Sequence, residues 1–373
     1  RFSLAQAFSR QEENEAALKQ VTHLLQNFPE TVIYPQVQLL HADILKKLGK
    51  TEQAISALDQ VAQWISANSA IEEFKKSLPK IISQQAELHQ ELQQNSKAYT
   101  LYRKLFIHHP ADPVTLQALP EMKRFGALPD VASVPLTLDE RSLRIKNLLA
   151  GVRYEQVIQE IQESNPPGPK MPENYYFYLA SAYQGLKKRS EANQTLKALL
   201  KQYPTHSRAD EVQYQIGRNL WNLGKDQAAI DFLKKSNTKN KVSNVSIKSQ
   251  FIIGRIYEEN KQNQQALKQY NHVVAQFGNA EYSQWAAWRM GWIHYLSNQY
   301  QKAHDQFREN ARHFPEGDFI EYNLFWQGKS LEGLGKKKAA HKIYRDVAQD
   351  YPYTYYGIRA RERVSADSVL APS

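Results

Sequence analysis

The sequence predicts an all-α protein, an α-solenoid or superhelix of about nine helix pairs. Three regularities in the second half of the chain predict this class. An alanine recurs every 37 residues, a small residue stands twelve residues before each alanine, and a large residue follows four residues after it. A fixed period of this length is the signature of stacked helical repeats, and no run of alternating β-branched residues indicates a sheet.

The first repeats are less regular than the later ones. Ala17 and Ala54 lie 37 residues apart, and Ala98 follows after 44 residues. The segment 111–138 carries four prolines, too many for continuous helix pairs, and indicates a junction. An irregular unit with Val157 in the alanine position follows it.

A strictly regular block begins near residue 174. Its alanines are Ala192, Ala229, Ala266, Ala303 and Ala340, and the small residues before them are Ala180, Gly217, Gly254, Gly291 and Gly328. This is the tetratricopeptide pattern, in which we expect the small residue of the first helix to face the alanine of the second. The domain organisation we predict is N-terminal helical repeats over 1–110, a proline-rich junction over 111–138, a regular superhelix over 139–364, and a tail or linker toward a further domain over 365–373.

Three columns of residues should face one side of the first helices. In tetratricopeptide arrays they lie three residues before the small residue, one after it and four after it. The first column here is aromatic: Phe177, Tyr214, Phe251, Trp288 and Phe325. The second is Ser181, Arg218, Arg255, Trp292 and Lys329, and the third is Gln184, Trp221, Glu258, Tyr295 and Glu332.

These columns allow two interpretations. As a binding groove, the rings would stack on a ligand or partner while the cations Arg218, Arg255 and Lys329 meet carboxylates or phosphates. As inter-repeat packing, the rings would be core, which we favour for the first column. The candidate ligand- or partner-binding residues are Arg218, Trp221, Arg255, Trp288, Trp292, Tyr295, Phe325 and Lys329. Trp285, Trp288, Trp292 and Tyr295 share one helix face, which suits either an interface between helices or ligand stacking.

Composition excludes several classes of site. The 48 Lys and Arg against 38 Asp and Glu give a net charge of +10, which favours an anionic partner or surface. There is no cysteine, so disulfides, zinc–thiolate sites and thiol nucleophiles are excluded. No glycine-rich phosphate loop, HExxH or GxSxG motif occurs, and we expect no cofactor, metal site or catalytic residue in this chain. We expect no nucleic-acid partner and no transmembrane segment; peripheral membrane contact stays open.

The segment from Asn323 to Val364 resembles the end of the helical superhelix of soluble lytic murein transglycosylases. The residues that carry the resemblance are Phe325, Trp326, Gly328, Lys329 and Leu331, then Tyr351, Pro352, Thr354, Tyr355, Tyr356 and Gly357. In that family an aromatic pair, a small residue, a basic residue and a leucine precede an alanine-bearing helix. A Tyr-Pro-x-Ser/Thr-Tyr-Tyr-Gly stretch then leads toward the catalytic domain.

The resemblance implies a periplasmic, non-catalytic scaffold, with its signal peptide removed, that positions peptidoglycan glycan strands. Tyr355 and Tyr356 would then seat a catalytic domain, which this sequence lacks together with the family's Gly-Leu-Met-Gln segment. The parent protein would cleave glycan strands. The alternative is a stand-alone periplasmic tetratricopeptide scaffold that binds a protein partner. A cytoplasmic adaptor or nucleic-acid binder is a third, less favoured interpretation.

Overall fold

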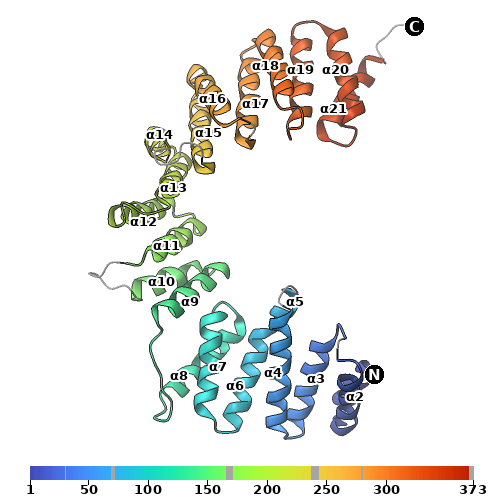
Figure 1. Ribbon diagram of the computed structural model, residues 1–373, viewed down its shortest axis with the longest axis vertical. Coiled ribbons are helices and arrows are strands. Elements are labelled where there is room, and N and C mark those ends of the chain that lie inside the picture. Colours follow the sequence, from blue (N-terminus) through green and yellow to red (C-terminus); the bar gives the residue numbers. More distant parts are fainter. Residues whose placement is uncertain (30, 69–71, 165–170, 237–242, 279, 369–373) are drawn as a thin grey trace. The chain divides into compact units, whose positions relative to one another are not determined.

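The protein is all-helical, without a strand, throughout the part that the computed structural model describes, which comprises residues 1–29, 31–68, 72–164, 171–236, 243–278 and 280–368. It forms two compact units, Arg1–Lys188 and Arg189–Ser373, called here the N-terminal unit and the C-terminal unit (Figure 1). Successive helices within each unit pack in antiparallel pairs, and each pair packs on its neighbours. The predicted α-solenoid is therefore confirmed. The predicted domain limits stay a prediction.

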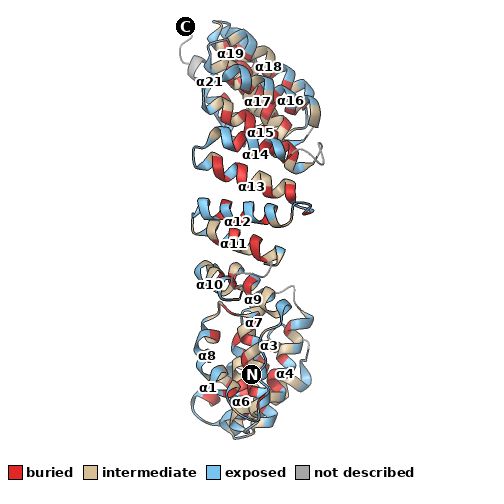
Figure 2. Ribbon diagram, turned by 90° about the vertical axis from the view of Figure 1, so that its left-hand side faces the viewer, coloured by how far each residue is buried: buried red, intermediate tan, exposed pale blue. Residues whose placement is uncertain are grey.

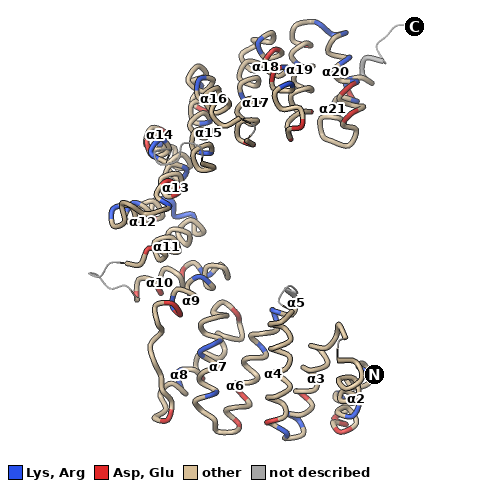
Figure 3. The backbone as a smooth tube through the Cα atoms, in the orientation of Figure 1, with Lys and Arg blue, Asp and Glu red and all other residues tan. Residues whose placement is uncertain are grey.

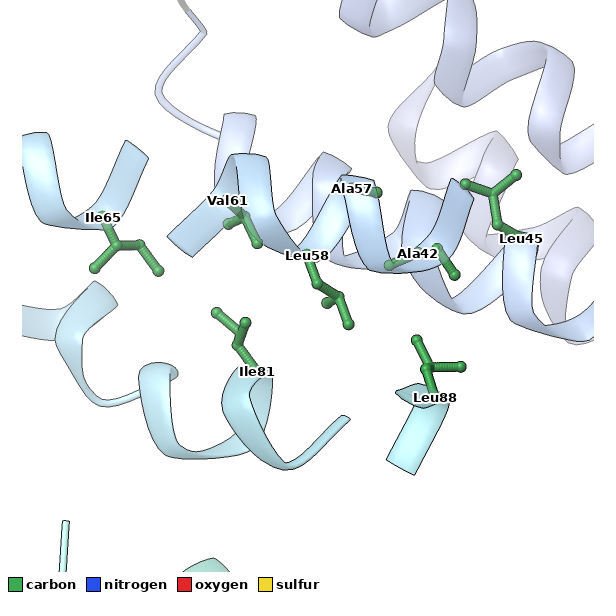
Figure 4. Packing of buried hydrophobic residues seen from close by; sticks show 9 residues of the cluster. Ala42, Leu45, Ala57, Leu58, Val61, Ile65, Ile81 and Leu88 are labelled. Atoms are coloured by element: carbon green, nitrogen blue, oxygen red, sulfur yellow. The ribbon is translucent and has the colours of Figure 1, made fainter. Parts of the chain in front are cut away.

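The N-terminal unit begins with three helix pairs and then changes pattern. Its helices are α1 (Phe2–Arg10), α2 (Asn14–Asn27), α3 (Tyr34–Lys47), α4 (Thr51–Ala67), α5 (Glu72–Lys75), α6 (Leu78–Glu91), α7 (Asn95–His108), α8 (Pro113–Gly126), α9 (Leu138–Ala150), α10 (Tyr154–Ser164) and α11 (Glu173–Gly185). Interlocking aliphatic side chains from α3, α4 and α6 form the core of the second pair, including Leu58, Ile65 and Ile81 (Figure 4).

The C-terminal unit is a regular array. Its helices are α12 (Arg189–Gln202), α13 (Ala209–Asn222), α14 (Asp226–Lys235), α15 (Asn244–Glu259), α16 (Asn263–Phe277), α17 (Glu281–Leu296), α18 (Tyr300–His313), α19 (Ile320–Gly333), α20 (Lys337–Asp350) and α21 (Tyr355–Ser368). The first helices α13, α15, α17, α19 and α21 each pack on the next one, and every helix buries one side (Figure 2). One side of these first helices is therefore a continuous surface across repeats.

Three glycines of the repeat face aromatic rings of the second helix. A Cβ placed on Gly254 would lie 2.5 Å from the ring of Tyr270, and one on Gly291 would lie 2.5 Å from the ring of Phe307. Gly328 stands in the same relation to Tyr344. A Cβ on Gly217 would lie 2.7 Å from the Leu233 side chain and 3.2 Å from the Ala229 carbonyl oxygen, so the expected alanine is a neighbour in that repeat. In all four repeats, the large side chain four residues after the alanine fills the nearest space.

The turn between the two helices of a pair repeats the period in the backbone. Gly224, Lys261, Asn298 and Gly335 are spaced by 37 residues and have φ values of 69°, 58°, 56° and 73°. One residue in the left-handed conformation ends the first helix and allows the second to fold back beside it. The conformation recurs even where the residue is not glycine.

The prolines of 111–138 do not prevent a helix. Asp112 caps α8 by accepting from the Val114 N–H at 2.9 Å, and Pro113 occupies the first turn, where no donor is needed. Pro120 lies inside α8 on its exposed side. The expectation of an interrupted segment therefore holds only after α8, where residues 127–137 lead to α9 without a helix.

Candidate functional site

Aromatic rings form a continuous row on α17 and α19. Trp288 stacks on Trp292 with ring centroids 5.6 Å apart, and Trp292 stacks on Tyr295 at 5.8 Å. Trp326 of α19 meets the edges of Trp292 at 4.5 Å and Tyr295 at 5.0 Å. All four side chains are partly exposed. We call these four residues the aromatic cluster.

The repeat geometry explains this row. Trp288, Trp292 and Tyr295 lie three or four residues apart on α17, so their side chains rise from the same helix face. Helix α19 packs beside α17, which brings Trp326 against them. The three predicted columns include the α17 residues but not Trp326, because Trp326 stands one residue after the first-column position. The adjacent aromatic pair Phe325-Trp326 was the feature of the sequence that could have indicated it.

The row continues into α21. The indole N–H of Trp326 donates to the Tyr356 hydroxyl at 3.3 Å, and Tyr356 also packs on Phe325 and Tyr322 with centroids 4.9 Å and 4.6 Å apart. Burial raises the pKa of Tyr356. Tyr355 is 67% exposed, and its ring contacts that of Tyr356. Their predicted role as the seat of a further domain stays a prediction.

Phe325 belongs to the core instead of this surface. It is 6% exposed and packs on Tyr344 of α20 with centroids 5.4 Å apart. Phe251 is likewise buried and packs on Tyr270 of α16. Packing therefore accounts for these two members of the first column, whereas Trp288 of the same column is partly exposed.

The cations of the second column do not form an open basic ladder. Arg255 Nη2 donates to Glu259 Oε1 at 2.8 Å, and the same carboxylate accepts from the indole N–H of Trp221 at 3.0 Å. Lys329 Nζ lies 2.6 Å from Glu332 Oε2. Each carboxylate cancels most of the field of its partner cation at this surface.

Of the three cations of that column, Arg218 is the exposed one, and it lies on α13 beside Tyr214. Burial raises the pKa of Tyr214, and the nearby Arg218 charge acts against that change. Basic and acidic residues are likewise interspersed along the helices of each unit (Figure 3).

Sequence reasoning also missed a buried ionic group next to the cluster. Arg289 Nε donates to Glu258 Oε2 at 2.8 Å, with a second bond between Arg289 and the other carboxylate oxygen, and the Tyr270 hydroxyl donates to Glu258 at 2.8 Å. The side chains of Arg289 and Glu258 are 19% and 10% exposed. This group joins α15, α16 and α17 and fixes the helix that carries the three stacked rings.

The described residues contain neither a candidate metal site nor a candidate membrane-spanning helix. No group of three or more histidine, cysteine, aspartate or glutamate side chains there is arranged to hold a metal ion. Among the helices described, none is long and apolar enough to cross a membrane.

Three family models match parts of the chain. The model of the outer membrane lipoprotein YfiO matches residues 152–296, and tetratricopeptide-repeat models match residues 35–68 and 322–352. No curated protein matches. Among solved structures, MamA from Desulfovibrio magneticus RS-1 is 20% identical with a TM-score of 0.37, covering 48% of this chain and 93% of that one. YrrB, described as a tetratricopeptide protein with an unusual peptide-binding site, is 14% identical with a TM-score of 0.36, covering 56% and 97%.

These matches correct the resemblance to lytic transglycosylases, which was wrong. Most of the segment that suggested it, Asn323–Val364, lies within residues 322–352, which match a tetratricopeptide-repeat model instead. Repeat packing explains the shared residues: Gly328 makes room for the Tyr344 ring, and Tyr356 packs on Phe325. Gly357 lies so close to the Tyr351 carbonyl that no Cβ fits. The chain has a tetratricopeptide-like α-solenoid fold with two stretches that match repeat models, and glycan binding has no support.

Proposed function

We propose that this chain is a tetratricopeptide scaffold of the cell envelope that binds a protein partner through the aromatic cluster. The observation that carries the proposal is the continuous row of partly exposed rings from Trp288 to Trp326, extended by Tyr356. Tryptophan and tyrosine dominate the binding energy of protein interfaces, since they bury much area at a small entropic cost.

The pairing of charges favours a protein over an anionic polymer. Arg255 and Lys329 are already engaged with Glu259 and Glu332, so a polyanion would have to displace those carboxylates. A protein surface can instead use the rings as anchors and the charge pairs as a polar rim.

The candidate residues differ in the part of the binding surface to which this proposal assigns them. Trp288, Trp292, Tyr295 and Trp326 form its centre. Lys329 follows Trp326 by three residues on α19 and would contribute to the rim, as would Tyr355. Trp221, Arg255 and Arg218 lie on earlier first helices and would extend the same surface for a longer partner. A location in the envelope is supported by the similarity of residues 152–296 to an outer membrane lipoprotein model.

Photo-crosslinking in the native host tests the proposal. A photoreactive phenylalanine analogue replaces Tyr295 in the cluster. The matched control places it at Arg312, an exposed position on α18, the second helix of the same repeat. We expect one defined protein adduct from position 295 that is absent at 312 and disappears when Trp292→Ala is added. Identical adducts at both positions, or none at 295, would contradict a protein-binding cluster.

A further inference from the structure

A cleft of about 440 Å³ opens in the N-terminal unit, away from the residues assigned above. It is bounded by the end of α7, by α8, and by α9 and α10. Helix α7 packs against both α8 and α9, so the regular succession of helices is broken at this point. The volume is in the range of sites that hold a small organic molecule.

The approach to α9 is fixed by one arginine. Arg103 of α7 donates to the carbonyl groups of Val134 and Pro135 and to Glu140 Oε2, the last at 2.8 Å. Glu140 and Thr137 also form a capping box at the start of α9. Arg103 therefore holds the segment before α9, which carries Leu136 of the cleft, against α7, which carries Phe106 of the cleft.

One wall of the cleft is apolar. Phe106, Leu116, Leu119 and Leu136 line it, and Leu116 is 41% exposed. Thr115 lies on the same side and is 1% exposed, and its hydroxyl has no hydrogen-bond partner within the part of the chain that the structure describes. An unpaired buried hydroxyl is costly unless a ligand or water pairs with it.

The other wall is charged and contains one complete ion pair. Arg144 Nε donates to Glu160 Oε2 at 2.8 Å, and these side chains are 13% and 18% exposed. The Arg144 guanidinium also lies 3.5 Å from the centre of the Phe106 ring. Burial lowers the pKa of Arg144, while Glu160 acts to raise it. This pair links α9 to α10.

Two further residues of opposite charge, which form no ion pair with each other, lie beside this pair. Arg141 precedes Arg144 by three residues on α9, and Glu163 follows Glu160 by three residues on α10. Because α9 and α10 run antiparallel, both steps lead about one helical turn, about 5 Å, in the same direction. Among the described residues, the Arg141 side chain makes no hydrogen bond or ion pair, and the Glu163 carboxylate accepts only from the Gln159 amide at 2.8 Å. Both side chains line the cleft.

We infer that this cleft binds a small zwitterion with apolar side chains, such as an apolar dipeptide with free termini. Its carboxylate pairs with Arg141, its ammonium group pairs with Glu163, and its side chains contact Leu116, Leu119 and Leu136. The lining supplies one unpaired charge of each sign next to an apolar wall, which matches that ligand and no singly charged one. This site is independent of the aromatic cluster.

Calorimetric titration of the whole protein with the dipeptide Leu-Leu tests the inference. We expect saturable binding of Leu-Leu. N-acetyl-Leu-Leu lacks the ammonium group, Leu-Leu amide lacks the carboxylate, and Gly-Gly lacks the apolar side chains. Each should bind about tenfold more weakly or worse, as expected for loss of a charged hydrogen bond or of buried apolar area. Equal binding of all four compounds, or no binding of Leu-Leu, overturns the inference.

Matched variants locate the site. Arg141→Gln and Glu163→Gln should each weaken Leu-Leu binding about tenfold without lowering the melting temperature, since neither breaks an ion pair. Lys146→Gln and Glu155→Gln remove the same charges from exposed positions of the same helices outside the cleft. These controls should bind as the parent does. If control and cleft variants lose affinity equally, the binding is unspecific and the inference fails.

Combining the blocked dipeptides with the two protein variants shows which terminus of the ligand each charged residue contacts. Leu-Leu amide should bind the Arg141→Gln variant no more weakly than it binds the parent, because the contact that the variant removes is already absent. N-acetyl-Leu-Leu should behave in the same way with Glu163→Gln. A further loss in both combinations would show that these residues do not meet the termini as assigned.

Discussion

Gly291→Ala should destabilise the protein, although alanine is a better helix former than glycine. Gly291 lies inside α17, and a Cβ there would lie 2.5 Å, 2.7 Å and 2.8 Å from three ring carbons of Phe307. Normal carbon contacts need about 3.5 Å or more, so the ring would have to move by about 1 Å. Phe307 is fully buried.

Two opposing effects set the magnitude. Overpacking a full core costs about 1–3 kcal/mol, and replacing glycine inside a helix returns about 0.5–1 kcal/mol. We therefore expect the free energy of unfolding to fall by about 1–2 kcal/mol, measured by urea denaturation. The double variant Gly291→Ala with Phe307→Leu is the control, since the smaller side chain leaves room for the methyl group. Its loss should be clearly less than the sum of the two single losses. If Gly291→Ala is neutral or stabilising, helix propensity dominates and the ring-packing explanation of the small residues is wrong.

Two further predictions concern stability. Val152 is 62% exposed and has a φ of 60°, a conformation unfavourable for a β-branched residue. Val152→Gly should therefore raise the free energy of unfolding by about 0.5–1 kcal/mol. A lower free energy of unfolding in urea denaturation would contradict backbone strain at this position. Burial and the adjacent Glu258 raise the pKa of Tyr270, so the folded state holds that proton more tightly than the unfolded state. The resulting stability is complete below about pH 10 and is lost as the pH rises above it. Tyr270→Phe should cost about 1 kcal/mol at pH 8 but show a shallower decline from pH 9 to 11, and parallel declines would count against this pairing.

The period of the sequence predicted the fold because each repeat must bury the same face against the next one. The alanines, the small residues and the large residues four positions later all have structural counterparts, as Gly328 and Tyr344 illustrate. Helix α8 was not predicted because four prolines within residues 111–138 indicate an interrupted segment. Pro113 occupies a position where proline favours a helix start, and Pro120 lies on an exposed side.

The candidate site was only partly predictable. Helical spacing placed Trp288, Trp292 and Tyr295 on one face, since contacts within a helix follow from its 3.6-residue turn. The carboxylate partners of Arg255 and Lys329 were not assigned, although Glu259 and Glu332 lie four and three residues away. Choosing among several possible partners needs side-chain positions. Contacts between repeats, such as Trp326 with Trp292, need the packing of α17 on α19.

The affinity of the crosslinked partner for purified variants tests the central claim most directly. We expect Trp292→Ala to weaken binding at least about 30-fold, the loss of about 2 kcal/mol that marks an interface hot spot, while Arg312→Ala leaves the affinity unchanged. The ratio between parent and Trp292→Ala should stay constant between low and physiological salt, because stacking is not screened as exposed charges are. Equal affinities of parent and Trp292→Ala, both folded and with equal melting temperatures, would show that the partner does not bind at the aromatic cluster.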